Sequence, residues 1–194
     1  EKIRRKREKK LRKEKNRALR EAKLEEESNN FSNNLIDHKQ VELDDINEQL
    51  QSLNYEIKEI IADGHCLFRA IAYQSSKNND FMQLRNLCSQ YIKQHAENFI
   101  PFITDDITIE QYCQELVNQQ KVKWGGNLEL VALSNVLNST ITIYQANNQS
   151  PLIFKPDNIE QQQQQQQIKE EFIRLSFHQH YYGLGAHYNA IIKK

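Results

Sequence analysis

Long hydrophobic runs, paired cysteines and an initiating methionine are all missing from this 194-residue sequence. No apolar stretch approaches the roughly 18 residues that a membrane-spanning helix needs. No apolar segment follows the basic start, so we expect neither a membrane anchor nor a secretory signal. The three cysteines, Cys66, Cys88 and Cys113, are an odd number without a Cys-x-x-Cys pair. This pattern argues against a disulfide framework or a structural metal site and predicts a reducing, cytoplasmic environment.

Only one methionine is present, Met82, and the chain begins at Glu1, so we expect it to be an excerpt of a longer protein. Its length fits one globular domain of ordinary size together with an appendage. A domain of this size can bury a substantial core without help from disulfides or metals.

Charge is balanced overall but unevenly distributed, with 26 basic and 26 acidic residues in the whole chain. Residues 1–27 hold 13 of the basic and 7 of the acidic residues, which leaves 13 basic and 19 acidic residues elsewhere. This segment lacks Gly and Pro, and its apolar residues are too sparse for a self-sufficient coiled coil. We therefore expect a charged helical extension over 1–27, a polar linker over 28–34 and a globular domain over 35–194.

The basic extension has three interpretations. Its lysines and arginines could contact RNA or ribosomal particles through phosphates, act as a nuclear-import signal, or simply cover a solvated helix. No aromatic residue precedes Phe31, which argues against base stacking of the single-strand type.

Helical periodicity is concentrated in the first part of the domain and strand-like sequence in the second. An α+β domain is therefore predicted, with a mixed or mostly antiparallel sheet flanked by helices. Thr108 and Asn127 are expected to cap helices, and seven glutamines at 161–167 predict a flexible loop insertion. The expected helices are 41–53, 66–74, 80–99, 108–120 and 127–138, and the expected strands are 55–63, 139–147, 151–155, 171–179 and 186–194.

One candidate nucleophile is Cys66, which follows Asp63, Gly64 and His65 where a strand passes into a helix. Unpaired N–H groups and the dipole at a helix N-terminus favour a thiolate. Gly64 would let the loop curl so that backbone N–H groups face a developing oxyanion. The alternative is that Cys66 is a small apolar core residue, as most intracellular cysteines are.

A nucleophilic cysteine needs a base, and His187 is the best-placed of the six histidines. Asn189 lies two residues further along the same expected strand, so both side chains share a face. We expect Asn189 to accept the Nδ1 proton of His187 and turn Nε2 toward the thiol, a known variant of the catalytic triad. The alternative is an ordinary pair near the end of a strand. His65 is a poor candidate because neighbouring residues rarely face each other.

The other histidines and cysteines have simpler interpretations. His178 and His180 could share a metal, but no third ligand of matching spacing is visible, so exposed strand positions are expected. Cys88 and Cys113 fall on apolar helix faces and are expected in the core. No cofactor or metal is predicted.

Trp124, Gly125 and Gly126 precede a helix whose first turn contains Glu129. Paired glycines would let a substrate backbone approach closely, with the tryptophan as a wall beside the site. The alternative is a turn with an aromatic anchor.

Three segments together resemble the ovarian-tumour (OTU) family of cysteine deubiquitinases. They are DGHCLFRAIA at 63–72, WGGNLELVALS at 124–134 and YGLGAHYNAI at 182–191, and the separation of 121 positions from Cys66 to His187 also fits. The likeness covers residues 55–193 and points to the branch that carries a charged helical N-terminus. The seven glutamines have no counterpart in the family pattern.

This resemblance implies a papain-like cysteine protease fold and hydrolysis of the isopeptide bond after the C-terminal Gly-Gly of ubiquitin. Cys66 would be the nucleophile, His187 the base and Asn189 the orienting residue, while Asp63 would shape the oxyanion loop of Gly64 and His65. Many members have Asp at the position of Asn189, so the resting activity is expected to be modest. Substrate contacts are expected from Trp124, Gly125, Gly126, Glu129, Tyr182, Gly183 and Gly185.

Two other functional classes are compatible with the sequence. The chain could be a ubiquitin-binding protein of the same fold whose catalysis is weak. Alternatively, the basic helix could be the functional part, with the domain carried along as cargo.

Overall fold

The computed structural model describes the backbone of residues 2–75, 80–103, 107–147, 150–157, 171–182 and 185–194. The chain divides into two units, residues 1–40 and residues 41–194. The second unit contains the sheet, the shorter helices and the last turns of the N-terminal helix. The glutamine tract at 161–167 lies outside the described residues, so its expected loop conformation stays a prediction.

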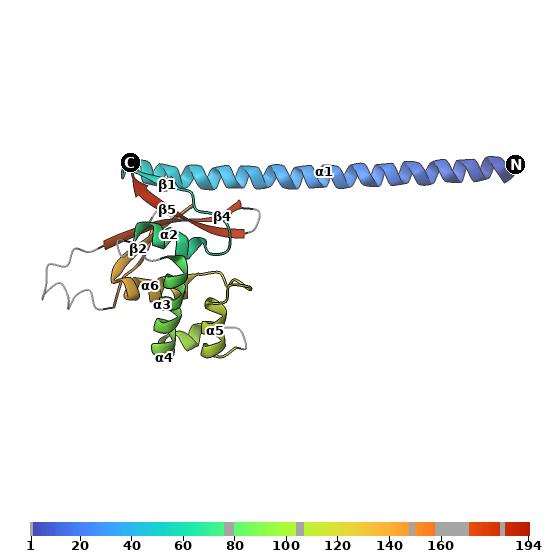
Figure 1. Ribbon diagram of the computed structural model, residues 1–194. Coiled ribbons are helices and arrows are strands. Elements are labelled where there is room, and N and C mark those ends of the chain that lie inside the picture. The colour runs from blue at the N-terminus through green and yellow to red at the C-terminus, as the bar shows by residue number, and fades with distance from the viewer. Residues whose placement is uncertain (1, 76–79, 104–106, 148–149, 158–170, 183–184) are drawn as a thin grey trace, which may run out of the picture. The chain divides into compact units, whose positions relative to one another are not determined.

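A five-stranded mixed sheet forms the centre of the second unit (Figure 1). Its strand order is β1-β5-β4-β2-β3, with β2 and β4 parallel and every other neighbouring pair antiparallel. The sequence-based fold class is confirmed, and each strand falls within or beside its expected segment. The strands are β1 (Tyr55–Lys58), β2 (Ser139–Gln145), β3 (Leu152–Phe154), β4 (Glu171–Tyr182) and β5 (Gly185–Lys193).

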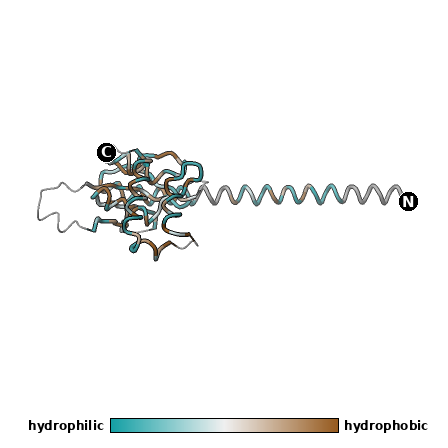
Figure 2. Tube along the Cα trace, turned by 60° about the horizontal axis from the view of Figure 1, so that its bottom comes forward, coloured by the Kyte–Doolittle hydropathy of each residue, from teal (hydrophilic) through white to brown (hydrophobic). Residues whose placement is uncertain are grey.

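Helices cover both faces of this sheet. On one face, Phe68, Leu84 and Leu133 belong to a core with Ile141 and Leu175 of the strands. Ile46 and Leu50, from the last turns of the N-terminal helix, pack on the other face against Tyr144 and Ile191. Figure 2 shows hydrophobic residues concentrated in residues 41–194. The shorter helices are α2 (Cys66–Gln74), α3 (Phe81–Gln94), α4 (Ala96–Phe99), the 3-10 helix η1 (Ile100–Phe102), α5 (Ile109–Leu116) and α6 (Asn127–Leu137).

The two expected helix caps have different outcomes. Thr108 caps α5 as expected, because its hydroxyl accepts a hydrogen bond from the Gln111 backbone. Asn127, however, is the first residue inside α6, and the N-cap is Gly126. The expected cap was wrong because the Glu129 carboxylate accepts a hydrogen bond from the Gly126 N–H, so this end of the helix needs no side chain at its cap.

One continuous helix, α1 (Lys2–Gln51), replaces the expected helix, linker and second helix. The linker prediction for 28–34 was wrong: asparagine and serine lower helix propensity only modestly, and the segment contains no Gly or Pro. Within the expected helix 41–53, Ile46 and Leu50 are buried, whereas Val41 and Leu53 are 56% and 47% exposed. No helix in the described part of the chain is both long and apolar enough to cross a bilayer.

Candidate active site

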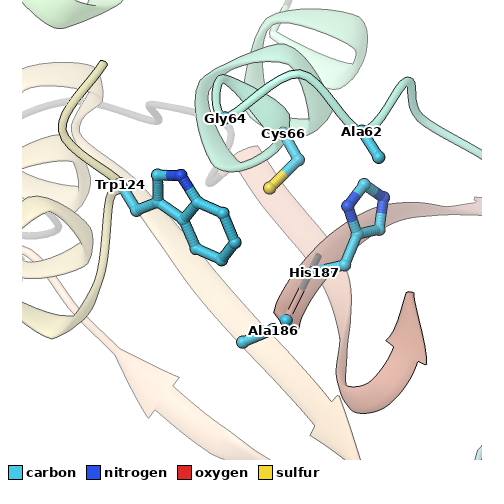
Figure 3. Close-up of a pocket in the computed structure, with 7 residues that line it drawn as sticks. Ala62, Gly64, Cys66, Trp124, Ala186 and His187 are labelled. Atoms are coloured by element: carbon cyan, nitrogen blue, oxygen red, sulfur yellow. The ribbon is translucent and has the colours of Figure 1, made fainter. Parts of the chain in front are cut away.

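Cys66 opens helix α2 and is only 9% exposed. Its thiol borders a cavity of about 20 Å³, which has room for roughly one water molecule. Figure 3 shows the Cys66 side chain between the imidazole of His187 and the indole of Trp124. The residues that line the cavity are Ala62, Gly64, Cys66, Trp124, Gly185, Ala186 and His187.

Asn189 and the backbone of Ile60 fix the imidazole of His187. Its Nε2 lies 3.0 Å from the Ile60 carbonyl oxygen and 3.1 Å from Asn189 Oδ1. Both partners are acceptors, because Asn189 Oδ1 already accepts a hydrogen bond from the Ile60 N–H at 2.8 Å. Nε2 therefore carries the proton of the neutral ring, and Nδ1 is the nitrogen on the side of Cys66 (Figure 3).

The expected roles of the two ring nitrogens were therefore reversed. Asn189 binds Nε2 and not Nδ1, although it lies on the shared strand face as expected. The sequence places the two residues on one face but carries no signal for the side-chain rotamer that decides which nitrogen meets the amide.

Burial sets the protonation states of the two reacting groups. It raises the pKa of the Cys66 thiol, which backbone hydrogen bonds from Tyr188 and Leu67 offset only in part. It also lowers the pKa of His187, against the opposing effects of Asn189 and Ile60. Burial of Cys66 thus opposes the thiolate-stabilising effect that was expected from the helix N-terminus. Both shifts favour the neutral forms of the thiol and the imidazole, and a neutral imidazole can accept a proton.

Asp63 shapes the loop before Cys66 through both of its carboxylate oxygens. Oδ1 accepts the N–H of His65 at 3.0 Å, and Oδ2 binds the Arg69 guanidinium at 2.7 and 2.8 Å. Burial raises the pKa of Asp63, but these hydrogen bonds outweigh it and lower the pKa below its ordinary value. The His65 ring packs at 4.8 Å against Phe81. The His65 amide is therefore occupied by Asp63, which leaves the amides of the first α2 turn to meet an oxyanion.

Trp124 lies between two glycines with positive φ angles, Gly64 at 79° and Gly185 at 114°. A Cβ at Gly64 would stand 3.3 Å from the indole nitrogen, and one at Gly185 would stand 3.3 Å from the six-membered ring. Since Trp124 is 49% exposed, it forms a wall of the cavity that solvent also reaches. All three line the cavity, Trp124 and Gly185 as expected substrate contacts and Gly64 as part of the expected oxyanion loop.

Gly125, Gly126 and Glu129 have structural contacts outside the cavity. A Cβ at Gly125 would approach Leu67 to 2.6 Å, so this glycine permits close packing on α2. Glu129 is 2% exposed, and its carboxylate accepts hydrogen bonds from Tyr112 and from Gly126. The structure thus gives Gly125 and Glu129 packing and capping roles, and the expected substrate contact of these residues stays a prediction. Gly183 and the side chain of Tyr182 lie outside the described residues.

Arg85 is a member of the site that the sequence interpretation missed. Its fully buried guanidinium donates to the carbonyl oxygens of Gly64 at 3.0 Å, Leu116 at 2.8 Å and Lys123 at 2.9 Å. It therefore ties the loop before Cys66 to the segment before Trp124. Its spacing of three residues from Cys88 on α3 could have placed it on the buried helix face.

His178 and His180 differ in environment. His180 is exposed as expected, but His178 is fully buried, so that expectation was wrong for His178. His178 lies opposite His187 in the β4–β5 pairing, and its Nε2 lies 2.9 Å from Ser176 Oγ. Helix α1 covers this sheet face from a distant part of the sequence, which strand alternation alone does not reveal. Cys88 and Cys113 are buried in the core, as expected.

Acid should destabilise the protein through His178. Burial and the neighbouring His187 lower the pKa of His178 to about 4, so between pH 6.5 and 4 the unfolded chain binds the proton more readily. The free energy of unfolding should therefore fall by about 3 kcal/mol as pH drops through this range. Urea denaturation of wild type and His178→Asn at several pH values measures this slope.

The control for His178 is His180→Asn, on the exposed position of the same strand. It should keep the wild-type slope, whereas His178→Asn should flatten it. Equal slopes in wild type and His178→Asn would contradict the burial of a neutral imidazole at this position.

Comparisons with known proteins agree with this geometry. A family model described as OTU-like cysteine protease matches residues 61–188. The human protein named deubiquitinase OTUD6B is 33% identical, over 99% of this chain and 63% of its own length. Ubiquitin thioesterase otu2 of Schizosaccharomyces pombe is 31% identical, over 69% of this chain and 44% of its own length. This chain thus spans about half the length of these relatives.

Solved structures support the fold. The OTU domain of OTUD1 superimposes with a TM-score of 0.62 at 23% identity, over 81% of this chain and 99% of that one. The Hazara virus OTU bound to ubiquitin gives 0.52 at 16% identity, over 73% of this chain and 82% of that one. The matched family segment contains Cys66 and His187, and with the sheet and cavity described above it shows that this chain belongs to the OTU-like cysteine protease family.

Proposed function

We propose that this chain is a cysteine deubiquitinase that hydrolyses the isopeptide bond after the C-terminal Gly-Gly of ubiquitin. One observation carries the proposal: Cys66 and His187 line the same cavity, with the imidazole ring held by Ile60 and Asn189. Relatives named deubiquitinase and ubiquitin thioesterase support the substrate class.

The neutral pair defines the first chemical step. As the Cys66 sulfur attacks the carbonyl carbon of the terminal glycine, its proton passes to Nδ1 of His187. Amides at the start of α2 stabilise the oxyanion. The imidazolium then returns the proton to the departing lysine amine, which leaves a thioester on Cys66. Water hydrolyses this thioester with His187 again as base, and the ubiquitin carboxylate is released.

The narrow cavity explains a preference for glycine. Trp124 packs so close to Gly64 and Gly185 that even a Cβ on either glycine would be crowded. A cavity of about 20 Å³ leaves little room for a substrate side chain, and a Gly-Gly tail has none to place there. Asn189 is neutral and cannot offset the imidazolium charge, so we expect modest turnover.

The direct test uses ubiquitin with an electrophilic C-terminus. The wild-type chain should form one covalent adduct, which peptide mass spectrometry should locate at Cys66. The chain should also release free ubiquitin from an isopeptide-linked substrate. An adduct without any release of ubiquitin would favour the alternative of a ubiquitin-binding protein with idle catalysis.

A second proposal concerns the basic residues 1–27, which we infer contact RNA or ribosomal particles. Every side chain described between residues 13 and 31 is exposed, so the basic groups there are available to phosphates. Removing residues 1–34 should abolish RNA binding and leave ubiquitin turnover within a few-fold. In the full chain, the logarithm of the RNA association constant should fall as the logarithm of the salt concentration rises. The slope should be about −0.7 for each single-strand phosphate contacted. Salt titrations of both chains measure this, and binding that survives truncation would contradict the proposal.

A further inference from the structure

The matched family segment begins at residue 61, but contacts essential to the site come from before it. Ile60 supplies the carbonyl oxygen and the N–H that fix His187 and Asn189. His187, Asn189 and Ile191 alternate with residues of the opposite face along β5. Ile191 packs against Ile46 and Leu50 of α1. The sheet face that bears His187 is therefore the face that residues 41–51 cover.

Glu42 makes the most specific contact from this part of α1 to the sheet. Its side chain is 7% exposed. Its carboxylate accepts two consecutive backbone N–H groups of β4, from Gln179 at 2.6 Å and from His180 at 3.1 Å. Hydrogen bonds from two amides to one buried carboxylate are strong and directional. Glu42 therefore fixes this short stretch of backbone, 137 residues away in sequence.

These two amides lie at an irregular point of the sheet. The β2–β4 pairing ends at Phe177, and the β4–β5 register shifts between His178 and Tyr182. Regular ladder pairing therefore stops just before Gln179. His178 is the cross-strand partner of His187, so Glu42 binds the backbone directly beside the residue opposite the imidazole.

We propose that Glu42 is a positioning residue for His187, acting by clamping the irregular backbone of β4 from helix α1. This inference rests on the proposed deubiquitinase function. Glu42 does not line the active-site cavity, so it acts through β4 and not on substrate. Loss of the clamp should leave substrate binding intact and let the imidazole drift from its reactive orientation, to which rates are very sensitive.

The test compares Glu42→Gln with Glu48→Gln in the full chain. Glu48 is an exposed glutamate on the same helix, so its substitution makes the same chemical change without touching β4. In Glu42→Gln one amide loses its acceptor, because the new NH₂ group can only donate. We expect kcat on a fluorogenic ubiquitin C-terminal amide to fall about 10-fold with KM unchanged. A loss of this size corresponds to a displacement of the imidazole by well under about 1 Å. Glu48→Gln should retain wild-type kcat.

Two further readouts separate positioning from general damage. Amide hydrogen exchange at Gln179 and His180 should accelerate in Glu42→Gln and not in Glu48→Gln. Alkylation of Cys66 by iodoacetamide should slow in Glu42→Gln and not in Glu48→Gln, because a displaced imidazole accepts the thiol proton less readily. Glu42→Asp, which keeps the charge on a shorter side chain, should recover part of the lost kcat and provides a second variant should Glu42→Gln fold poorly.

The outcomes are distinguishable. Faster exchange at Gln179 and His180 with unchanged kcat would overturn the positioning role, and unchanged exchange would overturn the clamp itself. A parallel rise in KM or in Cys66 alkylation would indicate a purely structural role and would also overturn the proposal. If the wild-type chain neither turns over ubiquitin substrates nor reacts with the ubiquitin probe, the proposed function fails first.

Discussion

Replacing Cys66 with alanine should abolish both turnover of ubiquitin substrates and covalent capture by the ubiquitin probe. The substitution removes the atom that forms the thioester, and no other described residue in the cavity carries a nucleophilic sulfur. Turnover should fall to the background of the assay, a loss of at least about 10⁴-fold. The thermal midpoint should change little, since one small side chain replaces another. A fluorogenic ubiquitin amide, intact-mass analysis of the probe reaction and circular dichroism measure the three quantities.

The matched controls are Cys88→Ala and Cys113→Ala. Both thiols are buried in the core, where burial raises the pKa of each. Neither residue lines the active-site cavity, so both variants should keep wild-type labelling. A probe adduct on Cys88 or Cys113, or labelling that persists in Cys66→Ala, would show that the nucleophile has been assigned to the wrong residue.

Replacing His187 with alanine should lower turnover nearly as much as Cys66→Ala does, because Cys66 stays a neutral thiol when its proton has no acceptor. We expect kcat to fall by roughly 10³-fold or more. The double variant Cys66→Ala, His187→Ala should be no worse than Cys66→Ala alone, since the two groups act as a unit. Steady-state kinetics on the fluorogenic substrate measure these losses.

Asn189 and His180 supply the comparison for His187. Asn189→Ala removes one of the two acceptors on Nε2 but leaves the Ile60 carbonyl oxygen, so its loss should be milder than that of His187→Ala. His180→Ala changes an exposed side chain and should leave kcat unchanged. If Asn189→Ala were as damaging as His187→Ala, the amide would have to serve something beyond orienting the ring.

Local patterns in the sequence were sufficient for the strands of the sheet and for singling out Cys66 and His187, which line one cavity. Cys66 was predicted from a helix start, and His187 with Asn189 from the two-residue repeat of a strand, both of which are short-range signals. All five glycines fall within the three motif segments, and Gly64 and Gly185 have the positive φ angles that only glycine adopts readily.

Contacts between distant segments could not be predicted in this way. Burial of His178 depends on helix α1, which covers that sheet face from the other end of the chain. No local motif indicates that Arg85 supports the site, because its partners Gly64, Leu116 and Lys123 come from three separate segments. The reversed nitrogens of His187 reflect a rotamer, which no sequence pattern encodes.

The position of the only tryptophan gives the protein an internal optical reporter. Trp124 is the single indole in the chain, and it stands half-exposed at the wall of the reactive cavity. Excitation at the red edge of indole absorption therefore reports on this cavity without contributions from a second tryptophan. A peptide tail that enters between Gly64 and Gly185 must displace solvent from the indole ring, which shifts its emission. Occupancy of the cleft can thus be followed in unlabelled protein, even in variants that have lost all turnover.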